Sequence, residues 1–160
     1  MIEIKNIKTK YLTKKLIKNI CILKDSYWKF GASSQKEWFK NNNKKNDLHN
    51  LLFYKNKLVG YTCLRKKKIF FGKIKKYYLL FDTLIINKKY RKLKLSNILM
   101  KYNNNVIEKS HYYSFLLCDE KLINFYKKFL WKNANFNIKI NTKHENLINK
   151  KIMCFNLDNS

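Results

Sequence analysis

The chain has 160 residues, of which 46% are hydrophobic, and a formal net charge of +26 at pH 7. This length fits one domain with one core, and no stretch approaches the roughly 20 apolar residues that cross a bilayer. The N-terminal residues carry scattered lysines without the apolar region of a secretion signal. We therefore expect a single cytoplasmic domain over residues 1–160 that has no membrane partner and is a monomer or a homodimer.

The excess of basic residues has two interpretations. A polyanionic partner, such as nucleic acid or an anionic cofactor, would select for it. Codon bias toward A and T would also produce it, because glycine occurs only three times, proline is absent, and Lys, Asn, Ile, Tyr and Phe are abundant. We attribute most of the lysines to codon bias, although the charge attracts anionic ligands whatever its origin.

The four cysteines, Cys21, Cys63, Cys118 and Cys154, lie far apart in the sequence. They form no CxxC pair, and only three histidines accompany them. This spacing predicts neither a metal site nor a disulfide framework.

The predicted elements begin with an alternating strand, MIEIKNI, followed by an amphipathic helix from about Thr13. Apolar residues on this helix recur at three- and four-residue spacing: Leu16, Ile17, Ile20, Leu23 and Tyr27. Next comes a short helix over SQKEWFKN, with Ser33 or Ser34 as its cap and Glu37 as the capping-box partner of Ser34. The segments HNLLFYK and KLVGYTCLRKK then read as a hairpin joined at Asn56-Lys57.

The second half of the chain continues this alternation of strands and helices. A long apolar strand, YYLLFDTLII, precedes a basic turn and a helix whose stripe contains Leu95, Ile98, Leu99, Tyr102, Val106 and Ile107. The remaining segments predict a strand (YYSFLLC), a short helix (EKLINFYKKF, with Leu122, Phe125, Tyr126 and Phe129 inward) and two closing strands (ANFNIKI and KIMCFNL). The sequence therefore predicts an α/β domain with a mixed sheet of about seven strands flanked by about four helices.

The basic turn YRKLKLS resembles the acyl-CoA signature of the GNAT acyltransferase superfamily, Arg/Gln-x-x-Gly-x-Gly/Ala. Leu84, Ile85 and Ile86 match the hydrophobic strand end that precedes it, and Tyr90-Arg91 match its usual Tyr-Arg. Lys94 stands where the first glycine of the signature belongs, and Ser96 stands at its small residue.

A second motif, CDEKLINFYKKFLWK, resembles the family segment Asn-x-x-Ala-x-x-Phe-Tyr-x-x-x-Gly-Phe. Asp119 falls on the Asn, Phe125 and Tyr126 on the aromatic pair, and Trp131 on the final aromatic residue. Leu130 stands in place of the glycine. The two motifs lie about 35 residues apart in the order that the family shows, and Trp131 resembles the aminoglycoside 2'-N-acetyltransferase branch.

The resemblance implies acetyl-CoA as co-substrate and no metal. It assigns coenzyme binding to Leu84, Ile85, Ile86, Arg91, Lys92, Leu93, Lys94, Leu95, Ser96, Asp119 and Asn124. A diphosphate needs several N–H donors at a helix N-terminus, where the helix dipole also favours an anion. Lys94 can donate its N–H to the diphosphate if its φ stays negative, as in an ordinary first helical turn, and its ammonium could also pair with a phosphate. The alternative is a plain basic helix start without a phosphate site.

The resemblance also implies a catalytic tyrosine, Tyr126, which would give a proton to the leaving thiolate. By alternation Asp82 shares a face of its strand with Leu84 and Ile86, and it is the first candidate for binding or deprotonating the amine. It could instead be a structural carboxylate that pairs with a lysine. His49 and His111 are weaker candidates, because each stands at a strand edge.

We expect the amine acceptor to be a small molecule, such as an amino sugar, a polyamine or an antibiotic. Its pocket would lie at the first two helices and the last hairpin, near Tyr27, Trp28, Trp38 and Phe39. One alternative is a macromolecular amine on a protein or a charged tRNA. Another is a non-catalytic module that binds nucleic acid through its basic surface, although the sequence contains no RNP1-like or GxxG pattern.

Overall fold

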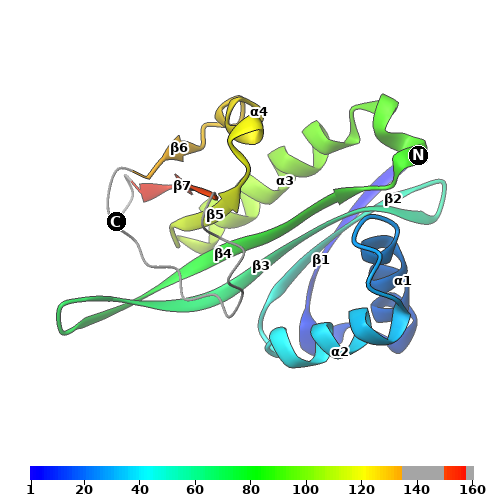
Figure 1. Ribbon diagram of the computed structural model, residues 1–160, viewed down its shortest axis with the longest axis horizontal. Coiled ribbons are helices and arrows are strands. Elements are labelled where there is room, and N and C mark those ends of the chain that lie inside the picture. Colours follow the sequence, from blue (N-terminus) through cyan, green and yellow to red (C-terminus); the bar gives the residue numbers. More distant parts are fainter. Residues whose placement is uncertain (135–149, 158–160) are drawn as a thin grey trace. The chain divides into compact units, whose positions relative to one another are not determined.

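A computed structural model describes residues 1–134 and 150–157 and divides the chain into two compact units (Figure 1). The first unit comprises Met1–Lys66 with Asp82–Asn103, and the second comprises Lys67–Phe81 with Asn104–Ser160. The described strands form one seven-stranded sheet in the order β1-β2-β3-β4-β5-β7-β6. Together with four α-helices, they confirm the expected mixed α/β fold and its element order. No helix among the described residues is long and apolar enough to span a membrane.

The first unit begins with β1 (Ile2–Lys8), the short 3₁₀ helix η1 (Thr9–Tyr11) and α1 (Lys14–Asp25). After α1 come α2 (Ala32–Asn42) and β2 (Leu48–Tyr54). The strands β1 and β2 pair antiparallel, and β2 pairs in the same way with the start of the next strand. Figure 1 shows α1 and α2 side by side next to β1 and β2.

The hairpin between β2 and β3 (Lys57–Phe71) turns one residue earlier than the sequence predicted. Lys55 and Asn56 are its two central residues, with φ values of 48° and 61°. A two-residue hairpin turn of this kind needs positive φ at both central positions, and the strands then end at Tyr54 and resume at Lys57.

The start of α2 also differs from the predicted one. Gly31 caps this helix with a φ of 89°, and its N–H donates to Asp25 Oδ1 at 2.7 Å. Ser33 and Ser34 lie inside the first turn, so the capping box expected between Ser34 and Glu37 does not form. The start of α1 is close to the predicted one: Thr13 caps the helix, and its Oγ1 accepts the N–H of Leu16 at 3.2 Å.

The core of the first unit has two hydrophobic layers. One joins α1 and α2 to a face of the sheet and contains Ile20, Cys21, Leu23, Phe39, Leu51, Tyr61, Cys63 and Ile85. The other contains Leu52, Val59, Ile86, Leu95 and Leu99, and it lies beneath the helix that follows the basic turn. Gly60 packs closely here, because a Cβ at this position would lie 2.7 Å from Ile86 Cδ1 and 3.2 Å from Leu52 Cβ, so these side chains would have to shift.

Three elements carry residues of both units: β3, β4 (Ile74–Ile86) and α3 (Leu95–Ser110). The 3₁₀ helix η2 (Lys88–Leu93) lies within the first unit, between β4 and α3. In the first unit, the N–H of Asn87 donates to Val59 O at 2.8 Å and continues the pairing of β4 with β3. The predicted stripe of α3 is mostly buried, with Leu95 and Leu99 at 1% and 0% exposure, but Ile98 is 39% exposed.

The second unit contains β5 (Ser114–Cys118), which pairs in parallel with Leu79–Phe81 of β4. It continues with η3 (Glu120–Leu122), α4 (Ile123–Lys127), β6 (Lys132–Asn133) and β7 (Lys151–Phe155). The strand predicted over KIMCFNL is thus confirmed, whereas all of ANFNIKI except Ala134 lies outside the described residues. Leu122, predicted to face inward, is 38% exposed.

Candidate functional site

In the basic turn, Lys94 adopts a backbone conformation that is typical of glycine. This residue has φ 54° and ψ 27°, in the left-handed region, and not the negative φ that the sequence suggested. Its N–H donates to Arg91 O at 3.3 Å, and its carbonyl accepts the N–H of Asn97 at 3.0 Å. A left-handed conformation costs a residue with a Cβ about 1–2 kcal/mol. The turn therefore keeps the shape that glycine would adopt without this cost.

The start of α3 has the features of an anion site. The first amides of a helix have no partner within the helix, and the helix dipole favours negative charge there. Leu95 is buried and anchors the first turn, whereas the four residues before it, Arg91, Lys92, Leu93 and Lys94, are exposed. The turn is itself braced by Asn87, whose Oδ1 accepts the N–H of Lys89 at 3.0 Å. Amides and cations are thus presented together at this end of the helix.

Asp82 lies on the opposite face of β4 from the one predicted. It pairs with Arg65 of β3, whose guanidinium lies 5.3 Å from the ring centre of Trp38 on α2. Asp82 thus shares with Ile85 the face that α1 and α2 cover. Leu84 and Ile86 pack with the layer beneath α3. Alternation is broken between Asp82 and Ile85, as happens where a β-bulge adds one residue to a strand.

The partner of Asp82 is an arginine and not a lysine. Arg65 Nε pairs with Asp82 Oδ2, while Asp82 Oδ1 accepts the hydroxyl of Thr83 at 2.9 Å. Both charged side chains are only 11% exposed. The chain contains just two arginines, Arg65 and Arg91, so one of them serves this ion pair. Arginine suits it because its planar fork holds a carboxylate in a fixed orientation.

Sequence reasoning missed Lys24, which is 6% exposed in α1. Its Nζ lies 3.8 Å from the ring centre of Trp38. Burial lowers the pKa of Lys24, and the nearby Asp82 carboxylate opposes this change. A signal was present in the sequence, because Lys24 follows Ile20 by four residues and so falls on the apolar stripe of the helix.

His49 is a satisfied core histidine and not a surface residue. It is fully buried, with Nε2 2.8 Å from Thr9 Oγ1 and Nδ1 2.8 Å from the Tyr61 hydroxyl. Burial lowers its pKa from 6.5 to about 4, and Lys24 adds to this effect. His49 is therefore neutral near pH 7. His111 is exposed and ends α3 with a φ of 57°.

The aromatic residues expected near the acceptor differ in their burial. Phe39 is a core residue at 4% exposure, whereas Tyr27 is 54% exposed and makes an edge contact with Trp28, with ring centres 5.0 Å apart. The guanidinium of Arg91 lies 5.8 Å from the ring centre of Tyr27. The connection from α1 to α2 therefore contacts the basic turn within the first unit.

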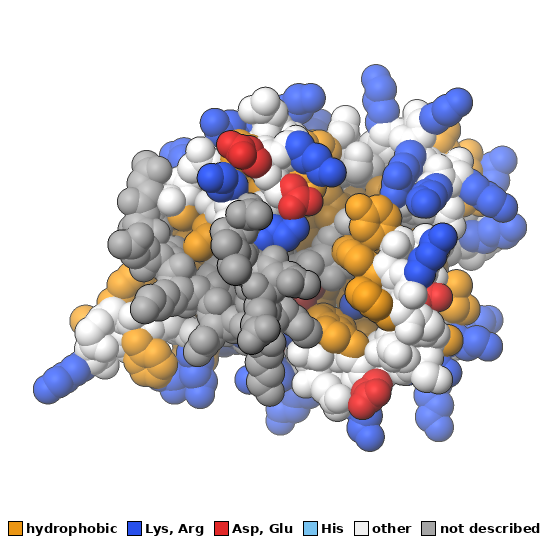
Figure 2. All heavy atoms as spheres, viewed as in Figure 1, with side chains coloured by type: hydrophobic (Ala, Val, Ile, Leu, Met, Phe, Trp, Pro, Cys, Tyr) orange, Lys and Arg blue, Asp and Glu red, His pale blue; other side chains and the backbone are white. Residues whose placement is uncertain are grey.

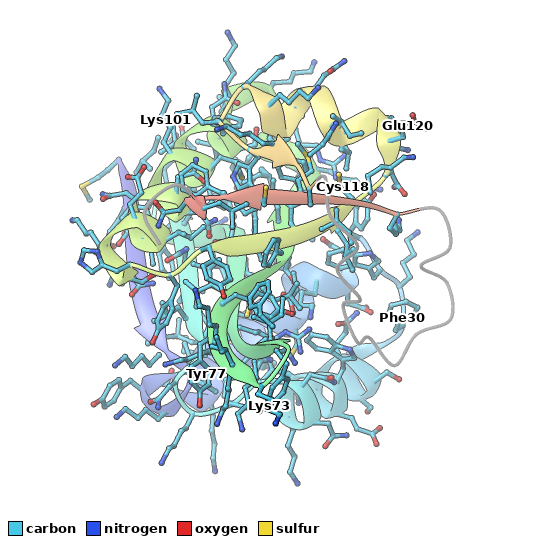
Figure 3. All side chains as sticks on the ribbon, turned by 90° about the vertical axis from the view of Figure 1, so that its left-hand side faces the viewer. Phe30, Lys73, Tyr77, Lys101, Cys118 and Glu120 are labelled. Carbon is cyan, nitrogen blue, oxygen red and sulfur yellow. The ribbon has the colours of Figure 1, made fainter. Side chains whose placement is uncertain are left out.

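In the second unit, aromatic packing fixes the ring of Tyr126. The ring centre of Phe81 lies 6.2 Å away and that of Phe125 5.2 Å away. Tyr126 O also accepts the N–H of Trp131 at 3.3 Å. Burial raises the pKa of the Tyr126 phenol, with a smaller contribution from Cys118 at the end of β5 (Figure 3). The hydroxyl makes no hydrogen bond to the described residues and stays protonated at neutral pH.

Asp119 and Asn124 complete the predicted residues of the second unit. Asp119 Oδ1 accepts Lys150 Nζ at 2.5 Å, and this hydrogen bond lowers the pKa of the Asp119 carboxyl. Asn124 is exposed on α4.

Leu130, like Lys94, has a left-handed backbone conformation at the position of a motif glycine. It replaces the motif glycine and has a φ of 66°, with its side chain 74% exposed. The next residue, Trp131, is buried and donates its Nε1–H to Asn104 Oδ1 at 3.0 Å. The left-handed residue thus turns the chain so that the tryptophan enters the core.

The predicted residues divide between the units. The first unit contains Asp82, Leu84, Ile85, Ile86 and the turn from Arg91 to Ser96, and the second contains Asp119, Asn124 and Tyr126. Within residues 1–134 and 150–157, no group of three or more His, Cys, Asp or Glu side chains could hold a metal ion. The four cysteines are buried, and none of them forms a disulfide with another.

Comparison with solved structures identifies the fold. An acyl-CoA N-acyltransferase from Pseudomonas aeruginosa superposes with a TM-score of 0.72 at 12% identity, covering 96% of this chain and 99% of the other. ElaA from Escherichia coli gives a TM-score of 0.68 at 15% identity, with the same coverage. The PaiA N-acetyltransferase from Thermoplasma acidophilum, solved with coenzyme A, gives 0.60 at 14% identity and covers 95% of this chain and 98% of its own.

The chain has the fold of the GNAT N-acetyltransferases, as its two motifs suggested. Neither a protein-family model nor a curated protein matches its sequence.

Proposed function

We propose that the chain is an N-acyltransferase that moves an acetyl group from acetyl-CoA to a primary amine of a small molecule. The observation that carries this proposal is the turn before α3, where Lys94 adopts the left-handed conformation of the motif glycine. A residue with a side chain adopts this conformation at a cost, which supports the proposal that the backbone of the turn binds a ligand. The amides of Leu95 and Ser96 would hold the diphosphate, with Lys94 and Arg91 as nearby cations.

The roles of the other residues follow the family resemblance. Main-chain groups of Leu84, Ile85 and Ile86 would pair with the pantetheine arm. The thioester supplies the carbonyl that the amine nitrogen attacks, and its C–S bond then breaks. Tyr126 would give its phenolic proton to the departing thiolate, a role that suits a hydroxyl whose pKa burial raises and which therefore stays protonated.

For Asp82 the structure favours positioning over proton removal. Both of its oxygens are already engaged, Oδ2 by the Arg65 guanidinium and Oδ1 by the Thr83 hydroxyl. We therefore assign Asp82 to the electrostatics of the acceptor site and leave deprotonation of the amine to solvent.

The test is a thermal shift experiment followed by a thiol-release assay. Acetyl-CoA at 100 times its Kd should raise the free energy of unfolding by about 2.7 kcal/mol if it binds only the native state. Incubation with a panel of primary amines should then release free coenzyme A thiol faster than incubation without an amine. The absence of both a thermal shift and thiol release would refute the proposal.

The second candidate is a macromolecular amine on a protein or a charged tRNA. Lys and Arg side chains stand out around the face in Figure 2, with few Asp and Glu among them, and the net charge is +26. A basic surface favours a polyanionic substrate through release of counterions. If RNA raises the melting temperature while acetyl-CoA does not, the chain is a nucleic-acid-binding module without catalysis.

A further inference from the structure

The outer end of the hairpin formed by β3 and β4 has no further strand beside it among the described residues. The pairing of β2 with β3 reaches no farther than Leu64, and β5 pairs with β4 only from Leu79 onward. Residues 67–78, here called the arm, belong to the second unit and form a two-stranded ribbon. Figure 1 shows the arm extending away from β5, β6 and β7 of that unit. A ribbon of two strands has little core of its own, so its outer side chains are available to a partner.

The end of the arm exposes three large apolar side chains. Phe70 is 65% exposed, Phe71 48% and Ile74 63%. Gly72, with a φ of 60°, and Lys73 form the two-residue turn between the strands. By strand alternation Phe70 and Phe71 point to opposite faces of the ribbon, and Ile74, directly after the turn, stands across from Phe71. Apolar side chains therefore occupy both faces of the arm's end.

Lysines surround this apolar end. The arm contains neither Asp nor Glu, and it carries five lysines: Lys67, Lys68, Lys73, Lys75 and Lys76. Lys76 Nζ lies 5.9 Å from the ring centre of Phe71, and Lys75 Nζ lies 5.3 Å from that of Tyr77. Basic and hydrophobic side chains lie together at the lower left of Figure 2, and Figure 3 looks onto this end of the hairpin. The charge of the arm therefore complements an anionic partner.

Charge and geometry together distinguish the partners that could cover the arm's end. A second copy of the arm carries the same positive charges and is repelled. A nucleic acid would meet the lysines with its phosphates and could stack bases on the two phenylalanine rings, but it offers the aliphatic Ile74 no comparable contact. A bilayer suits every feature, because its acyl chains surround an inserted end on both faces while the lysines stay among anionic headgroups.

We propose that the arm docks the protein onto a bilayer surface that contains anionic lipids. Phe70, Phe71 and Ile74 enter the boundary between headgroups and acyl chains, and the lysines behind them pair with lipid anions. Lys73 limits the depth, because its ammonium must reach back to the headgroups along its apolar stem. This inference goes beyond the proposed acyltransferase function and does not depend on it. The sequence was expected to have no membrane partner because no stretch spans a bilayer, but surface docking needs no spanning segment.

Cosedimentation of the full chain with sucrose-loaded vesicles tests the apolar end. Vesicles of phosphatidylcholine and phosphatidylserine should bind the chain, and vesicles of phosphatidylcholine alone should bind it far more weakly. Ile74→Ser should lower the partition coefficient about tenfold, because it removes an inserted apolar side chain. The matched control is Ile22→Ser, which removes the same side chain from a position of α1 that is 54% exposed. It should bind as the unsubstituted chain does, and both variants should keep their melting temperature.

A second pair of variants tests the charge. Lys68→Gln should lower the partition coefficient about fivefold, and this difference should shrink in high salt, where surface charges are screened. The control is Lys18→Gln, which removes the same charge from an exposed position of α1. Equal losses for the arm variants and their α1 controls would overturn the assignment to the arm.

The competing partners give different outcomes. A chain that does not sediment with anionic vesicles would overturn the proposal. If an RNA oligonucleotide binds instead, measured by fluorescence anisotropy, and Ile74→Ser weakens this binding, the arm is a nucleic-acid site. If the chain forms a dimer that Ile74→Ser abolishes, measured by analytical ultracentrifugation, the arm is an interface between two copies.

Discussion

The segments 84–96 and 119–131 each have another residue where the motif has glycine, and in both that residue adopts the left-handed conformation that favours glycine. Lys94 has a φ of 54° and Leu130 a φ of 66°. The two replacements differ in what their side chains add, because Lys94 puts a cation beside the first amides of α3 while Leu130 puts an apolar side chain into solvent. The difference teaches that the same turn forms with either side chain, and we propose a functional use of the side chain only at Lys94.

The largest expected effect concerns the chemistry of the second segment. Tyr126→Phe should lower kcat at least a hundredfold, because it removes a proton donor, and should leave the Kd of coenzyme A unchanged. The matched control is Tyr113→Phe, which removes another buried hydroxyl of the same unit that lacks a hydrogen bond. Steady-state kinetics that give equal kcat values for both variants would remove Tyr126 from the mechanism.

The next effect concerns the stability of the first unit at low pH. Its core contains the buried His49, whereas the core of the second unit consists mainly of packed aromatic rings. His49 has a pKa of about 4 in the folded chain against 6.5 when unfolded. Below pH 6.5 only the unfolded chain binds this proton, so stability falls until about pH 4, by about 3 kcal/mol in all.

Urea unfolding at pH 7 and pH 4 measures this loss, which His49→Gln should abolish. Asp47, whose pKa burial raises, acts in the opposite direction in both proteins and cancels in the comparison. A variant that loses as much stability on acidification as the unsubstituted chain would show that His49 does not cause it.

A smaller effect tests the cation of the first segment. Lys94→Gln should raise the Kd of coenzyme A about three- to tenfold, and the difference should shrink in high salt because an exposed charge is screened. Lys101→Gln removes a charge farther along α3 and is the control (Figure 3). Equal affinities for the two variants, measured by calorimetry, would mean that Lys94 is only tolerated in the turn.

The smallest effect tests the strain at Leu130. Leu130→Gly should raise the free energy of unfolding by about 0.5–1 kcal/mol, because the relief of a left-handed Cβ exceeds the entropy that glycine adds to the unfolded chain. Leu130→Ala removes most of the same side chain but keeps the Cβ, so it should leave stability unchanged. Denaturant midpoints that rank the alanine variant above the glycine variant would contradict the account.

Element order was predictable because strands and helices differ in apolar period, and both motifs stand in a strand-to-helix context. Local backbone geometry was harder to predict from the sequence. A negative φ was considered for Lys94, as in an ordinary first helical turn, yet its φ is 54°. The face of Asp82 was predicted wrongly because strict alternation does not hold between Asp82 and Ile85, and its partner Arg65 lies on another strand. Lys24 could have been found, since a lysine on an apolar stripe is visible in the sequence.

The most direct measurement follows the backbone amides at the start of α3 during a titration with coenzyme A. In ¹⁵N–¹H spectra, the signals of Leu95 and Ser96 should move downfield and shift more than any others, and pantetheine, which lacks the diphosphate, should leave them in place. If these two signals stay still while coenzyme A saturates the chain, the diphosphate is held elsewhere and the turn before α3 is only a basic corner of the fold.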